Sequence, residues 1–150
     1  MGKSTTTSTA ATETAAGEKS VTETAVRLPE NYCADGRLTD GEGIIRAEYL
    51  EKTAEEIAQA LRTLKASAFY SAFLKEAKDL RKKKVPYAAK KNYAQGLAIQ
   101  AKKLVHRKRE PAPGILVEMM QRVAATVTSA ETFEAMYMHL DAVYSYLLEE

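Results

Sequence analysis

The chain has 150 residues, of which 45% are hydrophobic and 28% are charged, and its formal net charge at pH 7 is +2. This composition predicts one globular domain with a real core, and no apolar run approaches the roughly 20 residues that a membrane span requires. A single cysteine, Cys33, excludes an internal disulfide framework and favours a reducing, cytoplasmic compartment.

The N-terminal 26 residues differ from the rest of the chain. Residues 4–16 consist of Ser, Thr and Ala with one acid, and they contain no aromatic or large aliphatic side chain. Such a segment cannot bury enough surface to offset the entropy lost on ordering. We therefore predict a disordered tail over 1–26 and a single domain over 27–150, which begins with an irregular, glycine-rich stretch up to residue 43.

Two helices are predicted in the first half of this domain. The first covers about 44–61, where apolar residues recur at near-helical spacing. The second covers about 66–83, and Phe69 and Phe73 lie on its apolar face. The four bases of 81–84 end it, at the helix terminus where cations are favoured.

Three further helices complete the predicted fold. The third covers about 86–108 and starts at a proline, and the fourth covers about 115–127. Thr128 and Glu131 match a capping box that would open the fifth helix. Five helices joined by short links predict an all-α protein that folds as a compact bundle.

Positive charge is concentrated in the middle of the chain. Residues 61–110 contain 15 of the 22 Lys and Arg residues against three acids, which gives this stretch a net charge of +12. The flanking stretches are acidic, with −4 over 27–60 and −5 over 111–150. A concentrated positive field favours a polyanionic partner, and nucleic acid is the commonest one. Lysines on solvated helix faces are the simpler explanation of such a pattern.

Helical spacing groups some of these bases. Lys75, Lys78 and Lys82 recur at steps of three and four, and Lys91 and Lys102 are three helical turns apart. A surface of this kind would hold RNA through its phosphates.

One base is expected to stand apart from these groups. Lys90 projects nearer the apolar stripe of its helix, at the exposed start of that helix.

The predicted RNA-binding residues are Lys75, Lys78, Arg81, Lys82, Lys84, Lys90, Lys91, Lys102, Lys103 and Arg107.

Residues that could support catalysis or hold a metal are few. His106, His139 and Cys33 are far apart in the sequence and show no metal-ligand spacing. The chain also lacks the glycine-rich phosphate loops and the nucleophile motif of common enzyme families. We therefore predict a protein that is not an enzyme and needs no metal or other cofactor, and we interpret His139 as an ordinary bundle histidine.

Four stretches resemble the small helical subunit of type III-A CRISPR interference (Csm) complexes. EYLEKTAEEIAQAL (48–61) is similar to that family's first long helix, and LKASAFYSAFLKEAKDLRKKK (64–84) is similar to its second. YAAKK (87–91) is similar to its middle helix, and FEAMYMHLDAVYSYL (133–147) is similar to its last. The family usually places an Arg shortly after the Ser that opens the second helix, whereas here no base follows Ser67 before Lys75.

The resemblance implies a non-catalytic subunit whose copies stack as a filament along the guide–target RNA duplex. Its partners would be guide RNA, target RNA, other subunits of the effector complex and copies of itself, with no membrane involved. Two alternatives remain from the residues alone. One is a stand-alone nucleic-acid-binding accessory domain, and the other is a helical adaptor for an acidic protein partner.

Overall fold

The computed structural model describes residues 27–29, 31–34, 38–40, 42, 44–107 and 112–149. The predicted disordered tail, 1–26, lies outside this set. Within the set, the regular elements are all helical, and the only β-type pairing is one isolated antiparallel bridge. The predicted all-α class is therefore confirmed.

The helical elements form five segments in the described part of the chain, as predicted. The elements are η3 (Ala47–Tyr49), α2 (Lys52–Ala60), α3 (Ala66–Phe69), η4 (Tyr70–Leu74), α4 (Lys75–Leu80), α5 (Tyr87–Gln95), α6 (Leu97–Val105), α7 (Ile115–Ala125) and α8 (Ala130–Glu149). Helices α3, η4 and α4 follow one another without a break, and we call them the first rod. Helices α5 and α6 join at Gly96, and we call them the second rod.

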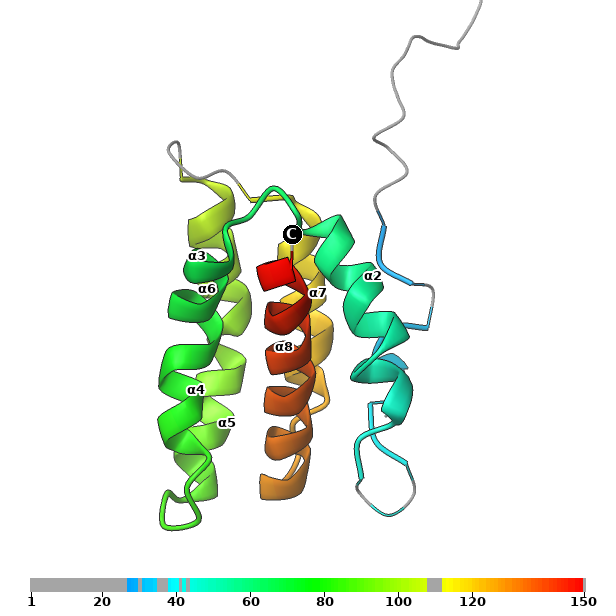
Figure 1. Cartoon of the computed structure of the whole chain (residues 1–150). Coiled ribbons are helices and arrows are strands. Elements are labelled where there is room, and N and C mark those ends of the chain that lie inside the picture. The colour runs from blue at the N-terminus through cyan, green and yellow to red at the C-terminus, as the bar shows by residue number, and fades with distance from the viewer. Residues whose placement is uncertain are drawn as a thin grey trace, which may run out of the picture.

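The last helix, α8, is the centre of the bundle. Helix α2 packs on one side of it, and the two rods pack on the other side through α3, η4 and α5 (Figure 1). The rods are antiparallel, so the chain descends through α3–α4, turns, and returns through α5–α6 (Figure 1). Helix α7 packs along α6. The basic segment of the sequence thus forms one helical hairpin.

Aromatic rings fill the interior between the rods and α8. Phe69, Phe73, Phe133 and Tyr137 are all buried. The Phe69 and Phe73 rings meet edge to face with their centroids 5.2 Å apart, a geometry that stabilises aromatic pairs. The core role that helical spacing predicts for these rings is confirmed.

The first rod contains a π-helical turn, η4, in its middle. A π turn accommodates an extra residue, and a carbonyl that loses its regular helical donor needs another partner. The Phe73 carbonyl accepts a hydrogen bond from the Tyr93 hydroxyl at 2.6 Å. Burial, together with the nearby charge of Glu76, raises the pKa of Tyr93, so this hydroxyl keeps its proton and ties the two rods together.

The first predicted helix is shorter than expected. We predicted a helix over 44–61, but α2 begins only at Lys52. The backbone before it is paired elsewhere: Asp40 N–H donates to the Ile44 carbonyl, and Arg46 N–H donates to the Leu38 carbonyl. Backbone groups in such a bridge cannot also form helical hydrogen bonds, so 44–46 is extended.

The start of α8 also differs from the prediction. The capping pair is Ser129 and Thr132, not Thr128 and Glu131. Thr132 N–H donates to the Ser129 hydroxyl at 3.2 Å, and Ser129 N–H donates to the Thr132 hydroxyl at 2.8 Å. In a capping box, a Glu side chain accepts a hydrogen bond from the backbone N–H of the cap residue three positions earlier. Here the Thr132 hydroxyl accepts that hydrogen bond from Ser129.

The second predicted helix ends earlier than residue 83. Helix α4 ends at Leu80, and 81–85 form the turn that leads to Pro86. The residue before a proline disfavours helical geometry, and four consecutive cations repel one another on a helix. The basic run therefore lies in a turn.

Candidate nucleic-acid interface

A groove separates the start of the first rod from the end of the second. It has a volume of about 410 Å³, and we call it the α6 groove. Its lining residues are Ser67, Ala68, Ser71, Ala72, Gln100, Lys103, Leu104 and Arg107.

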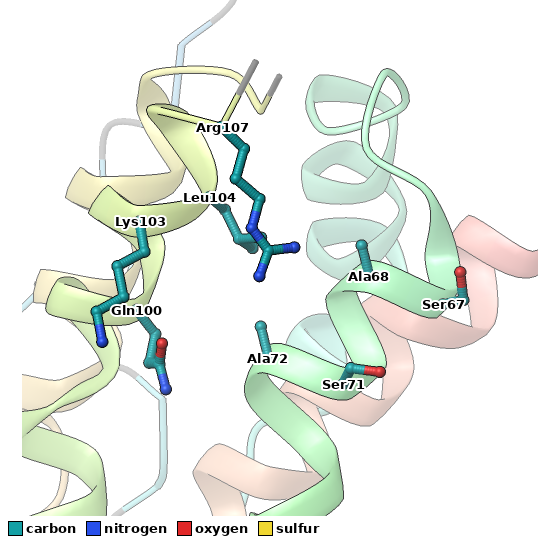
Figure 2. A pocket seen from close by; sticks show the side chains of 8 residues that line it. All are labelled: Ser67, Ala68, Ser71, Ala72, Gln100, Lys103, Leu104 and Arg107. Atoms are coloured by element: carbon teal, nitrogen blue, oxygen red, sulfur yellow. The ribbon is translucent and has the colours of Figure 1, made fainter. Parts of the chain in front are cut away.

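Small residues on one wall of the α6 groove create its space. Ala68 and Ala72 are one helical turn apart, and their methyl groups leave room for longer side chains from the opposite wall. The guanidinium of Arg107 extends across the opening toward them (Figure 2). The groove therefore has one wall of small side chains and one wall of cations.

The cations of the α6 groove have no ion-pair partner among the described residues. Lys103 lies in the last turn of α6, and Arg107 lies just beyond the end of that helix. Neither forms an ion pair or a side-chain hydrogen bond with another described residue. Unpaired cations maintain a positive potential, and a guanidinium presents a planar set of donors that suits phosphate oxygens.

A shallower depression extends the α6 groove along the seam between the rods. Its volume is about 250 Å³, and it shares Gln100 and Lys103 with the groove. It continues past Asn92 and Tyr93 to Glu76. A linear polymer could follow this open strip, whereas a small molecule would leave much of it empty.

A second basic site lies at the opposite end of the hairpin, around the turn between α4 and α5. It is an open cavity of about 740 Å³, and we call it the turn cavity. Its lining residues are Lys78, Asp79, Arg81, Lys82, Lys83, Lys90, Ala130 and Glu134.

One base of the turn cavity is already committed to internal contacts. Arg81 donates from Nε to Glu134 Oε1 at 3.0 Å, and its second nitrogen pairs with Glu134 Oε2. The Arg81 guanidinium also stacks over the Tyr137 ring, 4.2 Å from its centroid. The hydrogen bonds that Arg81 donates to Glu134 raise the pKa of Arg81. Arg81 thus joins α4 to α8 and has little capacity left for RNA.

The structure brings six of the ten predicted bases together in two places. Lys103 and Arg107 meet at the α6 groove, whereas Lys78, Arg81, Lys82 and Lys90 meet at the turn cavity. The remaining four line neither site: Lys75, Lys84, Lys91 and Lys102. The sequence pattern therefore describes two separate basic sites and not one continuous face.

Two of these lysines are not in the environment that the sequence predicts. Lys90 was expected at an exposed helix start, but it is only 5% exposed, because its long side chain runs over the Phe133 ring. Lys91 is half-buried, and its ammonium donates to the Val127 carbonyl at 2.6 Å. That contact occupies a carbonyl just beyond the C-terminal end of α7, where a cation is favoured.

Sequence reasoning missed part of both sites. Ser71 and Gln100 line the α6 groove and Lys83 lines the turn cavity, but none was predicted to bind a ligand. Lys83 could have been found, because it belongs to the run of four bases. The other two carry no sequence signal, since only the packing of the two rods brings them together.

His139 lies in a buried polar cluster on the other side of α8. One of its ring nitrogens, Nδ1, donates to the Tyr49 carbonyl at 2.7 Å. Nε2 therefore accepts from the Tyr32 hydroxyl, also at 2.7 Å. Burial lowers the pKa of His139 to about 4, against the opposing effect of the hydrogen bond to Tyr49. The histidine is neutral and holds Tyr32, which precedes the first helix, against the bundle. This is the role of an ordinary bundle histidine.

The described residues contain neither a metal-ligand cluster nor a membrane-spanning helix. No group of three or more His, Cys, Asp and Glu side chains in the described ranges could hold a metal ion. No helix there is both long enough and apolar enough to cross a membrane.

Comparison with known proteins finds no match for this chain among family models, curated proteins or solved structures.

Proposed function

We propose that the protein is a non-catalytic RNA-binding subunit of a cytoplasmic type III-A CRISPR interference complex, and that it holds target RNA through the phosphate backbone. The α6 groove is the observation that carries this proposal. Lys103 and Arg107, which form no ion pair with any residue in the described ranges, line an open strip between the two rods. Cations beside an extended groove suit a polyanionic strand.

The chemistry of the α6 groove favours phosphate contacts over base recognition. Its lining supplies an ammonium, a guanidinium, hydroxyls and one amide, but no aromatic ring on which a base could stack. Tyr93 lines the adjoining depression, but its hydroxyl is bound to the Phe73 carbonyl. Phosphate contacts give affinity without reading sequence, so base pairing with a guide RNA would supply the choice of target.

The resemblance to the Csm small subunit supports this assignment of the groove. In that family an Arg usually follows the Ser that opens the second helix, and here that position is not basic. Arg107 reaches the same region from the end of α6, beside Ser67 and Ala68 (Figure 2). A base from another helix would then replace the missing contact.

Stacking of copies would follow from the segregation of charge. The exposed acids Glu51, Glu55 and Glu56 lie on or beside α2, on the opposite side of α8 from the basic hairpin. Opposite charges on opposite sides of a subunit favour a head-to-tail contact between neighbours. The filament along guide and target RNA is proposed on this basis.

Salt-dependent RNA binding tests the proposal. The logarithm of the affinity for single-stranded RNA should fall linearly with log salt, with a slope of about 0.7 for each neutralised phosphate. Replacing Lys103 by Glu should weaken binding and reduce the slope. The matched control is Lys52→Glu, which is the same charge reversal at an exposed position on α2. A flat salt response, or equal loss in both variants, would reject the α6 groove as the RNA site.

Co-purification distinguishes the complex from a stand-alone RNA-binding domain. Expressed in a host that carries the full interference system, a tagged chain should recover a guide RNA together with larger protein subunits. Recovery of the chain alone, with salt-dependent RNA binding intact, would favour the accessory-domain alternative.

A further inference from the structure

We infer that the turn cavity binds a phosphate monoester, such as the terminal phosphate of a nucleotide or of an RNA 5′ end. This site is separate from the α6 groove and does not depend on the proposed RNA-binding function. It lies at the other end of the hairpin, and the two sites share no lining residue.

The buried Lys90 is the first observation for this site. Its side chain is 95% buried, given its relative exposure of 5%, and it lines the cavity. Its ammonium lies 5.9 Å from the centroid of the Phe133 ring, at the outer limit of a cation–π contact. No described residue accepts a hydrogen bond from it or forms an ion pair with it. A buried cation without a partner is unfavourable unless a ligand supplies the anion.

The nearest carboxylates do not serve as that partner. Both carboxylate oxygens of Glu134 accept hydrogen bonds from Arg81, and the two charges of this pair cancel. Asp79 is exposed at the border of the cavity and forms no ion pair with a described base. The remaining charges are Lys78, Lys82, Lys83 and Lys90, so four ammonium groups outnumber one free carboxylate.

The shape and charge of the cavity select the ligand class. Three segments wall it, namely the end of α4 with its turn, α5, and the start of α8 at Ala130. The N-terminal end of the 20-residue α8 adds positive potential at the same place. A phosphate monoester carries close to two charges at pH 7, whereas a phosphodiester carries one, so four converging lysines favour the monoester. A volume of about 740 Å³ also accommodates an attached nucleoside.

The test is an NMR titration of the full-length protein with adenosine 5′-monophosphate, with adenosine as the control. The monophosphate should shift the amide signals of Ala130 and Glu134 saturably, and adenosine should not. Lys90→Met should weaken binding about tenfold or more, because a charge-assisted contact is lost. Lys102→Met, on the exposed side of α6, should leave it unchanged.

Further variants and ligands in the same titration identify the source of the phosphate and control for a Lys90→Met variant that does not fold. Lys82→Gln and Lys83→Gln change only exposed side chains, and together they should also weaken binding. A 5′-phosphorylated oligoribonucleotide that binds more tightly than its 5′-hydroxyl twin would identify an RNA end, whereas equal binding of the free nucleotide would identify a mononucleotide. Absence of a saturable shift, or unchanged binding in both Lys90→Met and the double variant, would overturn the inference.

Discussion

The two sides of α8 bury polar groups in opposite ways. On the α2 side, His139 is neutral and has a hydrogen-bond partner at each ring nitrogen, the Tyr32 hydroxyl and the Tyr49 carbonyl. On the side of the rods, Lys90 is almost as deeply buried, but its ammonium has no acceptor among the described residues. Complete hydrogen bonding is typical of a group that stabilises the fold, whereas an unpaired buried charge is typical of a group that serves a ligand.

The largest change in stability is expected on replacing His139, the buried group with a structural role. His139→Leu removes two hydrogen bonds from a fully buried site, so we expect the free energy of unfolding to fall by about 4 kcal/mol. Urea unfolding followed by circular dichroism measures this change. RNA affinity of the folded fraction should not change, because His139 lies on the other side of α8 from the α6 groove. If His139→Leu lowered the free energy of unfolding by no more than a substitution at an exposed residue does, the structural role of His139 would be contradicted.

A pH titration sharpens the same contrast. The unfolded chain protonates His139 near pH 6.5, whereas the folded chain keeps it neutral down to about pH 4. The unfolded state therefore binds more protons between these values, and stability should fall by about 3 kcal/mol as the pH drops through this window. Chemical unfolding at a series of pH values measures it. His106→Gln, at an exposed histidine, should keep the dependence, and His139→Leu should lose it.

The opposite sign is expected for the buried lysine. Lys90→Met keeps the length of the side chain and removes an unpaired buried charge, so the unliganded protein should gain about 1 kcal/mol. The same unfolding assay measures this gain. A loss as large as that of His139→Leu would show that Lys90 has a structural partner and would remove the contrast between the two sides.

The smallest effect is expected at exposed bases. Lys75→Gln and Lys102→Gln should change stability by less than about 0.5 kcal/mol, because neither side chain forms an ion pair with a described residue. The midpoint of thermal unfolding measures this. A larger change at either position would mean that the basic hairpin depends on charges that the structure leaves unpaired.

Local sequence patterns were sufficient to predict most of the fold. The all-α class, the five segments and the buried Phe69 and Phe73 follow from apolar spacing, since a helix that buries one face repeats that spacing along its length. The start of the first helix was predicted wrongly because a backbone bridge overrides helical preference there. Residues 44–46 pair with 38–40 across a turn, and their own sequence does not specify that contact.

The basic sites were less predictable than the helices. Counting charges identified the segment whose bases line both cavities, but it could not show that Arg81 is paired with Glu134, 53 residues away. It also could not show that Lys90 is buried by Phe133, because that depends on how α5 crosses α8. Which charges stay free is decided by tertiary contacts, and a single sequence does not reveal them.

The π turn at 70–74 has a consequence for how related genes could diverge. Deleting one codon here would convert the rod to a regular α-helix, and it would rotate Lys75, Lys78 and every later residue of α4 by about 100° relative to α3. Insertion or loss of a single residue is thus a simple evolutionary step that turns the lysines of α4 toward a different neighbour and leaves their identities unchanged.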